Sequence, residues 1–372
     1  MRQEVLPVPL SGPFLDEREE ELVVEVMRSG RLSLGPMVDR FEELFAAKLG
    51  VPYAAAVSSG TAGLHLLCVA AGIEPGDEVI TSPYSFAASA NCFVYEGGVP
   101  VFADIDGRTL NMDPRAVEAA ITPRTKAIVA VDIYGYPCEL DELRAIADRN
   151  GLLLIDDSCE ALGAEYRGAP LGSHGPSAVF AFYPNKQMTT GEGGMVTTHS
   201  EEEWRLLRSL RNQGRGDEGG WLEHVRLGFN YRLDDLHAAI GIGQLEKLDE
   251  ILALRSAVAK RYDALLGGLP GVELPCPDDE AHKRSWFVYV IALPDNDTRE
   301  RAIATFEREQ IGYNRYLPSI HLQPYMRERY GFREGMCPVS EDASSRTLAL
   351  PFFTALDSDS QERVADVLSS AL

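Results

Sequence analysis

Short apolar runs alternate with helix-like segments through the first half of the chain, and this alternation limits the possible folds more than any other feature. Runs typical of strands occupy 78–81, 99–103, 126–131 and 152–155, and helical patterns lie between them. Such units build a mainly parallel sheet with helices on both faces. The sequence therefore predicts an α/β fold.

Functional residue types gather in the loops that follow three of these strands, at 82–86, 132–136 and 156–163. Ligands of open α/β sheets bind beyond the carboxyl ends of the strands. Asp157 ends an apolar strand, and a buried carboxylate requires a donor or a charged partner. A protonated pyridine nitrogen, Mg²⁺ and another protein group all remain open as that partner. Phe86 could stack on a ligand ring or belong to the core.

Lys186 stands between the aromatic run 180–183 and the glycine cluster 191–194. This pattern favours a strand that ends and a turn that begins. A lysine held out of water at such a place loses its proton more readily and becomes a nucleophile that can form a Schiff base. A surface lysine beside a turn is the alternative, so the assignment depends on the other motifs.

A small-residue turn at 58–63 follows the apolar run 53–57 and precedes a helical pattern. A Ser/Gly/Thr turn that opens a helix presents N–H groups at the positive end of the helix dipole, which suits a phosphate. An ordinary N-cap has the same appearance. Neither a Walker lysine pattern nor a dinucleotide fingerprint accompanies the turn.

The composition excludes several classes of partner. A net charge of -22 disfavours nucleic acid and anionic membranes. The six cysteines show neither a CxxC pattern nor metal-ligand spacing, so we expect reduced thiols and no metal. The first ten residues lack an apolar signal core, and no segment reaches membrane-spanning length. We therefore expect a cytoplasmic protein.

Four motifs follow one another along the chain: Ser59-Gly60-Thr61-Ala62, Ile155-Asp-Asp157-Ser-Cys-Glu160-Ala-Leu-Gly-Ala164, Phe182-Tyr-Pro-Asn-Lys186 with Gly191-Glu-Gly-Gly194, and Gly228-Phe-Asn230-Tyr-Arg232. Their order and rough spacing resemble the nucleotide-sugar aminotransferases of the DegT/StrS type. The resemblance covers almost the whole chain and extends to 211–215 and 317–321. Each motif alone is weak, but the ordered set is specific.

This resemblance implies a pyridoxal 5'-phosphate (PLP) enzyme of fold type I. The fold would be a mainly parallel, seven-stranded-type sheet between helices, with a smaller C-terminal α+β domain. Relatives are normally homodimers with shared active sites. The expected reaction moves an amino group, with L-glutamate as the expected donor, to a keto sugar nucleotide of the 4-keto-6-deoxy or 3-keto hexose type.

Site residues can be carried over one by one from the resemblance. Lys186 would form the Schiff base and move a proton at the substrate carbon, and Asp157 would keep the pyridine nitrogen protonated, which makes the ring an electron sink. The other cofactor contacts would be Gly60, Thr61 and Ala62 at the phosphate, Phe86 stacked on the ring, Glu160, and Asn230 with Arg232 at the partner subunit's phosphate. Substrate contacts would be Tyr183, Tyr316 and His321.

Four positions depart from the family pattern. Ala181 stands where a phosphate-binding Ser is common, and Glu160 where Gln or His is common. Asp132 and Gln213 both stand where His is common. We expect the last two changes to tune the sugar pocket or its surroundings, and the sequence leaves the role of Glu160 open.

The chain changes character after the active-site region. Residues 233–266 read as one long helix. We expect a large PLP-binding domain over 1–250 and a small domain over 251–372, with a strand at 285–291 and helices near 340–348 and 360–372. Two alternative functions share the fold. A PLP-dependent sugar dehydratase is disfavoured because that branch carries His at the lysine position, and the Lys186/Asp157 pair argues against a non-catalytic regulatory relative.

Overall fold

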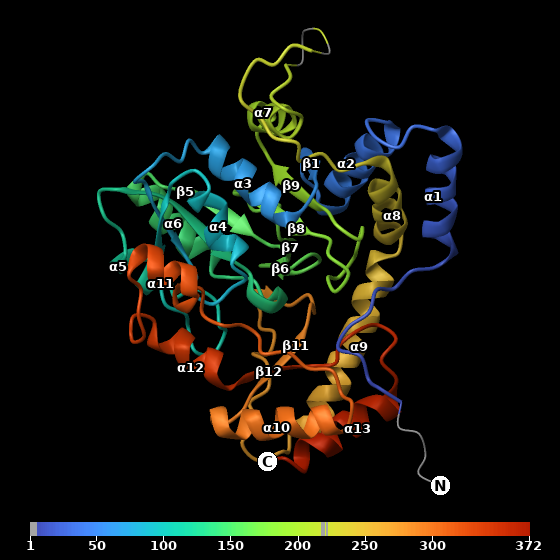
Figure 1. Cartoon of the computed structure of the whole chain (residues 1–372), viewed down its shortest axis with the longest axis vertical. Coiled ribbons are helices and arrows are strands. Elements are labelled where there is room, and N and C mark those ends of the chain that lie inside the picture. Colours follow the sequence, from blue (N-terminus) through green and yellow to red (C-terminus); the bar gives the residue numbers. More distant parts are fainter. Residues whose placement is uncertain (1–5, 217–219, 221) are drawn as a thin grey trace.

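The computed structural model describes residues 6–216, 220 and 222–372. In this part of the chain seven strands form one sheet in the order β1-β9-β8-β5-β4-β2-β3 (Figure 1). Neighbouring strands are parallel except at β9, which is antiparallel to β1 and β8. The predicted, mainly parallel sheet is confirmed. Its strands are β1 Tyr53–Val57, β2 Glu78–Thr81, β3 Val99–Phe102, β4 Thr125–Val131, β5 Leu153–Asp157, β8 Ser177–Ala181 and β9 Gly194–Thr198.

Helices cover both faces of this sheet because its side chains alternate between two apolar clusters. On β1, Ala55 and Val57 face one side, and Ala54 and Ala56 face the other. Helices α3, α4 and α7 pack on the first face, and α2 and α8 pack on the second at its β1 end. At the β3 end, α5 and α6 cover the second face. These helices are α2 Pro36–Leu49, α3 Gly60–Ala70, α4 Ala88–Val94, α5 Pro114–Ala119, α6 Leu140–Asn150, α7 Glu201–Arg211 and α8 Asp235–Glu246.

The prediction of one continuous helix over 233–266 is wrong in one respect. The segment divides at Lys247 into α8 and α9 (Leu248–Leu266). Lys247 has non-helical angles, and its Nζ lies 2.7 Å from Asp16 and 2.8 Å from Glu19, at the start of α1 (Glu17–Ser29). A tertiary ion pair thus accompanies the break. Helix α8 itself approaches its neighbours closely, since a Cβ on Gly241 would lie 2.7 Å from the Phe41 ring.

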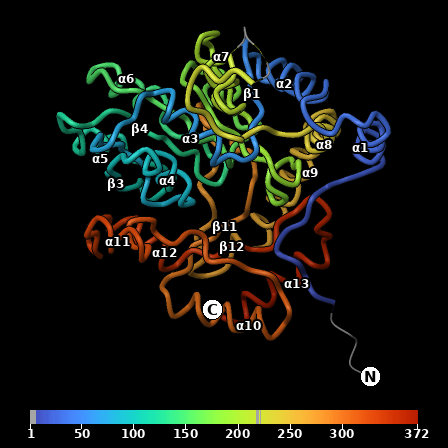
Figure 2. Tube along the Cα trace, turned by 45° about the horizontal axis from the view of Figure 1, so that its top comes forward, coloured from blue at the N-terminus to red at the C-terminus, as the bar shows by residue number. Residues whose placement is uncertain are grey.

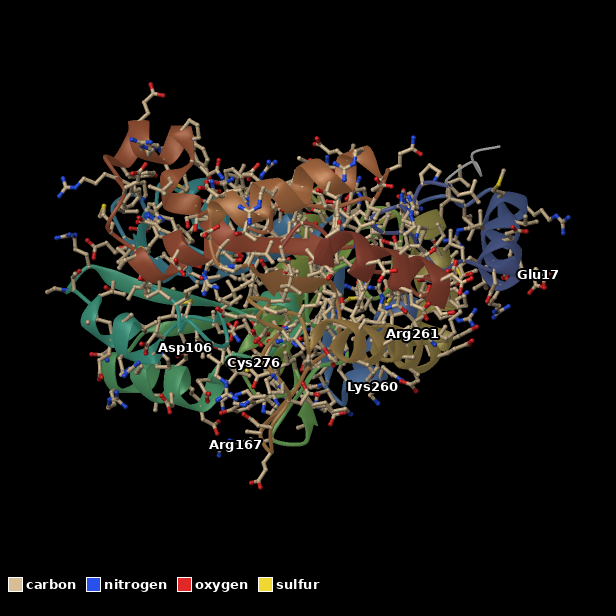
Figure 3. All side chains as sticks on the ribbon, turned by 90° about the horizontal axis from the view of Figure 1, so that it is seen from below. Glu17, Asp106, Arg167, Lys260, Arg261 and Cys276 are labelled. Carbon is tan, nitrogen blue, oxygen red and sulfur yellow. The ribbon has the colours of Figure 1, made fainter. Side chains whose placement is uncertain are left out.

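A smaller unit follows, and α9 runs from the large sheet down into it (Figures 1 and 2). Strands β11 (Tyr289–Ala292) and β12 (Thr347–Leu350) pair antiparallel at its centre. Helices α10 (Asn296–Arg308) and α13 (Ser358–Ser369) pack together with α9 around them, and α10 and α13 lie side by side when seen from below (Figure 3). Its remaining helices are α11 Pro324–Tyr330 and α12 Pro338–Arg346.

Two expectations for this unit need correction. Residues 347–350 form β12 and not the end of a helix, because the apolar Thr-Leu-Ala-Leu run pairs with β11. The strand expected from residue 285 begins only at Tyr289, because the side chain of Ser285 and the carbonyl oxygen of Phe287 bond to groups outside any sheet.

The N-terminal segment also lies against the small unit. Val8 donates to the carbonyl oxygen of Gln310 and accepts from Gly312, and the carbonyl oxygen of Leu10 accepts from Phe352. Residues from both ends of the chain thus stabilise one another. Within the described residues, none of the helices has both the length and the apolar character needed to cross a membrane.

Candidate active site

Lys186 lies in the turn after β8, between a carboxylate and an aromatic ring. Its Nζ is 3.5 Å from Oε1 of Glu160 and 3.9 Å from the centre of the Phe287 ring. The lysine side chain is 13% exposed and the Glu160 side chain 11%. The expectation of a lysine held out of water at the end of a strand therefore matches its position. Sequence reasoning missed Phe287, whose role depends on packing across some 100 residues of chain.

Asp157 ends β5 and is buried. Its Oδ2 accepts a 2.6 Å hydrogen bond from Oγ of Ser89, and its Oδ1 accepts from the backbone N–H of Cys159 at 3.3 Å. Ser89 is in turn 2.7 Å from Oγ of Ser85, in the loop that carries Phe86. The Phe86 ring is 65% exposed. A chain of hydrogen bonds through Ser89 therefore links the Asp157 carboxylate to the loop that carries the exposed Phe86 ring.

The small-residue turn forms the first turn of α3. Oγ of Ser59 caps the helix by accepting from Ala62 at 3.1 Å. Among the described residues, the N–H groups of Gly60 and Thr61 make no hydrogen bond to protein. A Cβ on Gly60 would lie 2.8 Å from both Ala181 and Cys159, so the turn lies tightly against β8 and the loop after β5. These free donors at a helix N-terminus suit a phosphate.

Arg255, which sequence reasoning also missed, ties the lysine turn to the small unit. This α9 residue is buried, and its Nη2 donates to the carbonyl oxygen of Lys186 at 2.8 Å while its Nη1 donates to that of Phe287 at 3.1 Å. Burial lowers the pKa of the Arg255 guanidinium to about 10, so it remains a cation at neutral pH. A signal for it existed in the sequence, since Arg255 interrupts the apolar face between Ile251 and Val258.

We expect Arg255→Met to lower the free energy of unfolding by about 1–3 kcal/mol, because carbonyl groups of Lys186 and Phe287 lose their donor in a buried place. Arg261→Met is the matched control. Arg261 is exposed on the same helix (Figure 3), so its replacement should stay within about 0.5 kcal/mol of the parent. Urea unfolding titrations of the parent and the two variants measure the difference. Equal unfolding midpoints for the two variants would show that Arg255 does not stabilise the lysine turn.

A row of stacked aromatic rings, called the aromatic wall below, lies near the lysine turn and contains Tyr134, Tyr316 and Phe287. The Tyr316 ring stacks between those of Tyr134 and Phe287, at centroid distances of 6.4 Å on each side. Its hydroxyl accepts from Nδ2 of Asn185 at 3.5 Å. Tyr183, in the lysine turn, is 53% exposed. Tyr183 and Tyr316 therefore lie in or beside the lysine turn, and their contact with a substrate remains a prediction.

His321 lies apart from this group. It is completely buried, its Nε2 is 3.0 Å from Glu341, and its ring contacts that of Phe102. No described contact joins it to the lysine turn, and its assignment to the substrate remains a prediction.

Asn230 and Arg232 lie on a turn beside the small-residue turn, where the carbonyl oxygen of Tyr231 accepts from the N–H of Ser58 at 2.9 Å. Nη1 of Arg232 donates to Asn212 at 3.0 Å, and its buried Nε has no acceptor among the described residues. Burial, followed by the charges of Arg215 and Arg211, lowers the pKa of Arg232. The Arg232 turn therefore lies beside the start of α3 in the same chain, and Arg211 near it is paired with Glu42.

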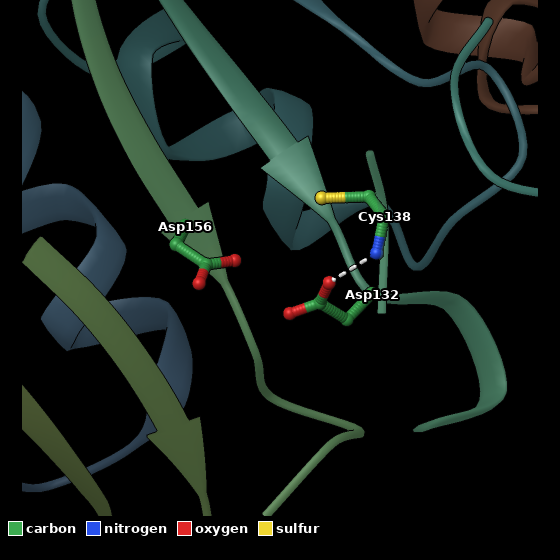
Figure 4. A group of neighbouring side chains, drawn as sticks. All are labelled: Asp132, Cys138 and Asp156. Carbon is green, nitrogen blue, oxygen red and sulfur yellow. Dashed lines mark hydrogen bonds between the residues drawn. The ribbon is translucent and has the colours of Figure 1, made fainter. Parts of the chain in front are cut away.

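Asp132, expected to tune the sugar pocket or its surroundings, is fully buried and lies within 4.8 Å of Asp156 and Cys138 (Figure 4). Its oxygens accept from the N–H of Cys138 at 2.8 Å and from Oγ of Ser158 at 2.7 Å. Burial raises the pKa of both carboxyls, and that of Asp156 is raised further by Asp132. Burial also raises the pKa of the Cys138 thiol. The raised pKa values favour the neutral forms of these three buried groups.

A sequence profile of the DegT/DnrJ/EryC1/StrS aminotransferase family matches residues 13–369. The chain belongs to this family. The match extends over both the large sheet and the small unit, as the resemblance of the motifs implied.

Relatives of this aminotransferase agree with the assignment. It is 37% identical over 374 residues to the spore coat polysaccharide biosynthesis protein SpsC of Bacillus subtilis. This alignment covers 97% of this chain and 96% of SpsC. DesV of S. venezuelae superposes with a TM-score of 0.90 at 34% identity, over 97% of this chain and 98% of DesV. PseC of Helicobacter pylori, an aminotransferase involved in pseudoaminic acid biosynthesis, superposes with a TM-score of 0.93 at 28% identity. The superposition covers 98% of this chain and 99% of PseC.

Proteins of this family depend on PLP. Spr1654 of Streptococcus pneumoniae, with a TM-score of 0.94 at 25% identity over 98% of each chain, has been solved in PLP and PMP forms. The chemistry of this aminotransferase's own residues fits the cofactor: a lysine whose side chain is 13% exposed, a strand-end carboxylate, a ring with a free face, and uncommitted N–H groups at a helix start. The predicted cofactor and fold type are therefore confirmed.

Proposed function

We propose that this PLP-dependent aminotransferase moves an amino group from L-glutamate to a keto sugar nucleotide of the 4-keto-6-deoxy or 3-keto hexose type, in amino-sugar biosynthesis. The observation that carries the proposal is the largely covered Lys186, whose side chain is 13% exposed, near Glu160 in a chain whose family performs amino transfer. The names of SpsC and PseC, which refer to a polysaccharide and to pseudoaminic acid, support a sugar substrate.

The cofactor would be held by groups from several elements. Gly60, Thr61 and Ala62 would bind its phosphate at the start of α3, where two N–H groups are free. The exposed Phe86 ring would stack on the pyridine, and the Asp157 carboxylate would hold its nitrogen in the charged form. When bound, PLP supplies an electron sink for the substrate carbon that carries the amino group.

This chain's own groups supply the remaining chemistry. Lys186 Nζ would attach the cofactor and, once released, move the proton at the substrate carbon. Tyr183 and Tyr316 would line the substrate's path to Nζ, and the aromatic wall would limit the access of water to the amine. We include His321 among the substrate contacts only as an expectation from the resemblance.

We also propose a homodimer with shared sites, in which Asn230 and Arg232 reach the partner's phosphate. The described part of the segment between α7 and α8 projects from the body of the chain (Figure 1), and Leu222 and Leu227 in it are 82% and 87% exposed. Apolar side chains so exposed on a projecting segment suit a protein interface. Ala181 offers no hydroxyl to the phosphate, which increases the need for donors from elsewhere.

The substrate assignment is tested by incubating the PLP-loaded protein and L-glutamate with a panel of keto sugar nucleotides. Formation of 2-oxoglutarate together with an aminated sugar nucleotide, both identified by mass, is the expected result. If every member stays unaminated while glutamate still converts the cofactor, the sugar nucleotide is the wrong acceptor.

Subunit mixing tests the shared site. Chains carrying Lys186→Ala and chains carrying Asn230→Ala with Arg232→Ala should each be inactive, and a mixture refolded together should regain part of the activity. One site of each mixed dimer would then combine two intact halves. A mixture that stays inactive although mixed dimers form, or an active monomer, contradicts the proposal.

The absorption spectrum separates the remaining alternatives. An aminotransferase should be yellow, and its spectrum should shift when L-glutamate is added. A colourless protein that ignores PLP would indicate a regulatory relative, whereas a dehydratase would act on the sugar without consuming glutamate. We propose a cytoplasmic location, which the six unpaired cysteines support because a reducing compartment keeps thiols free.

A further inference from the structure

Glu160 is the carboxylate closest to the proposed reactive amine. One of its oxygens lies 3.5 Å from Nζ of Lys186, and the other accepts the backbone N–H of Tyr134 at 2.9 Å. Gln187 binds the carbonyl oxygen of Glu160. The side chain and the backbone of this glutamate are thus both fixed beside the lysine.

Tyr134, whose N–H donates to Glu160, is itself fixed by its backbone conformation and its hydrogen bonds. It adopts a left-handed backbone conformation with φ 55°. Its hydroxyl donates to Tyr84 at 2.9 Å, and its carbonyl oxygen accepts from Arg284 at 3.1 Å. Because these two bonds orient this residue, its N–H supplies a fixed donor to one carboxylate oxygen and leaves the other for Lys186.

The groups around Glu160 leave few charges in contact with it. The titratable groups that interact electrostatically with Glu160 are Lys186, Asp157, Cys159, Tyr84, Tyr134 and Tyr316. Burial raises the pKa of the thiol and of all three phenols, so these stay neutral. Asp157 is already bonded to Ser89 and Cys159. Lys186 and Glu160 are therefore each other's nearest partner of opposite charge in a nearly buried place.

We propose that Glu160 accepts the proton of Lys186, so that the lysine becomes a neutral amine without releasing its proton to water. The N–H bond breaks at Nζ and an O–H bond forms at Oε1. The ammonium becomes an amine and the carboxylate becomes an acid. This inference rests on the proposed role of Lys186, and it gives a function to the acidic residue that stands where Gln or His is common.

The transfer is favoured by the surroundings. Both groups are nearly buried, and burial penalises charged forms, so a neutral acid beside a neutral amine is less costly there than in water. Burial raises the pKa of the Glu160 carboxyl, although the Lys186 ammonium opposes part of that rise. When two groups exchange one proton directly, as proposed here, that proton stays with the pair over a range of pH. The fraction of neutral amine is then nearly independent of pH within that range.

The test measures how fast PLP attaches to Lys186 in the apoprotein, from about pH 6 to pH 8.5, below the pKa of an ordinary lysine. Borohydride fixes the attached cofactor, and peptide mass identifies the residue. The comparison is with Glu160→Gln, which keeps the shape and an acceptor for Tyr134. Glu165→Gln removes a surface carboxylate that pairs with Lys283 and serves as the matched control.

The ratio of the parent rate to the Glu160→Gln rate cancels the titration of PLP itself. In Glu160→Gln the lysine must lose its proton to water, so the ratio should fall about tenfold per pH unit as the pH rises. Glu165→Gln should follow the parent. A ratio that is constant, or that rises with pH as a simple ion pair would cause, overturns the proposal.

A second measurement needs no variant. Nα-acetyl-lysine must always lose its proton to water, so the ratio of the parent rate to its rate should show the same decrease with pH. A constant ratio contradicts the role of Glu160 even if Glu160→Gln does not fold. Failure of the parent to attach PLP at Lys186 would instead overturn the proposed function, which distinguishes the two failures.

Discussion

Lys186→Ala should abolish amino transfer while the protein stays folded. The side chain contacts Glu160 and the Phe287 ring, and the backbone carbonyl that Arg255 holds is unchanged in the variant. Loss of a positioned acid/base group alone costs about 100-fold or more, and loss of the attachment point for the cofactor adds to this. Product formation from glutamate measures the effect.

Lys260→Ala is the matched control for this experiment. Lys260 is an exposed lysine on α9 (Figure 3), far from the lysine turn in sequence, so its replacement should leave turnover and the visible spectrum unchanged. Near-parental turnover by Lys186→Ala, without any added amine, would show that another residue carries the chemistry.

Asp157→Asn should lower the rate more than it weakens cofactor binding. The amide keeps the shape and can still accept from Ser89, but it carries no charge to hold a pyridinium. A charge-assisted hydrogen bond is worth roughly 1.5–3 kcal/mol, which corresponds to about a 10- to 150-fold loss in rate. Turnover and PLP titration by absorbance separate the two effects.

Asp156→Asn offers a control on the neighbouring residue. Asp156 faces Asp132 and not Ser89, and an amide resembles its protonated form, so amino transfer should be retained. If both variants bind PLP and turn over like the parent, Asp157 has a structural role and another acid supports the ring.

The residues that sequence could predict share one property: their surroundings are local. Lys186 lies between its own aromatic run and its own glycines, and Asp157 ends the strand that precedes it. The parallel sheet was predictable because each βαβ unit lies within one stretch of chain. Such features follow from neighbours along the sequence.

What could not be predicted depends on contacts between distant segments. Arg255 reaches the lysine turn from α9, and Phe287 reaches it from the segment before β11. Lys247 ends α8 where its amine meets Asp16 and Glu19, although the apolar period continues through it. Residues 347–350 form a strand because β11 lies next to them. Tertiary contacts override local propensity at each of these places.

The contact between the N-terminal segment and the small unit has a consequence for how the chain folds during synthesis. Val8 and Leu10 are synthesised long before their partners at 310–312 and at Phe352. The small unit therefore cannot complete its packing until these later residues have been made. During that interval the large sheet, whose strands all lie within residues 53–198, has its full sequence available and can form first.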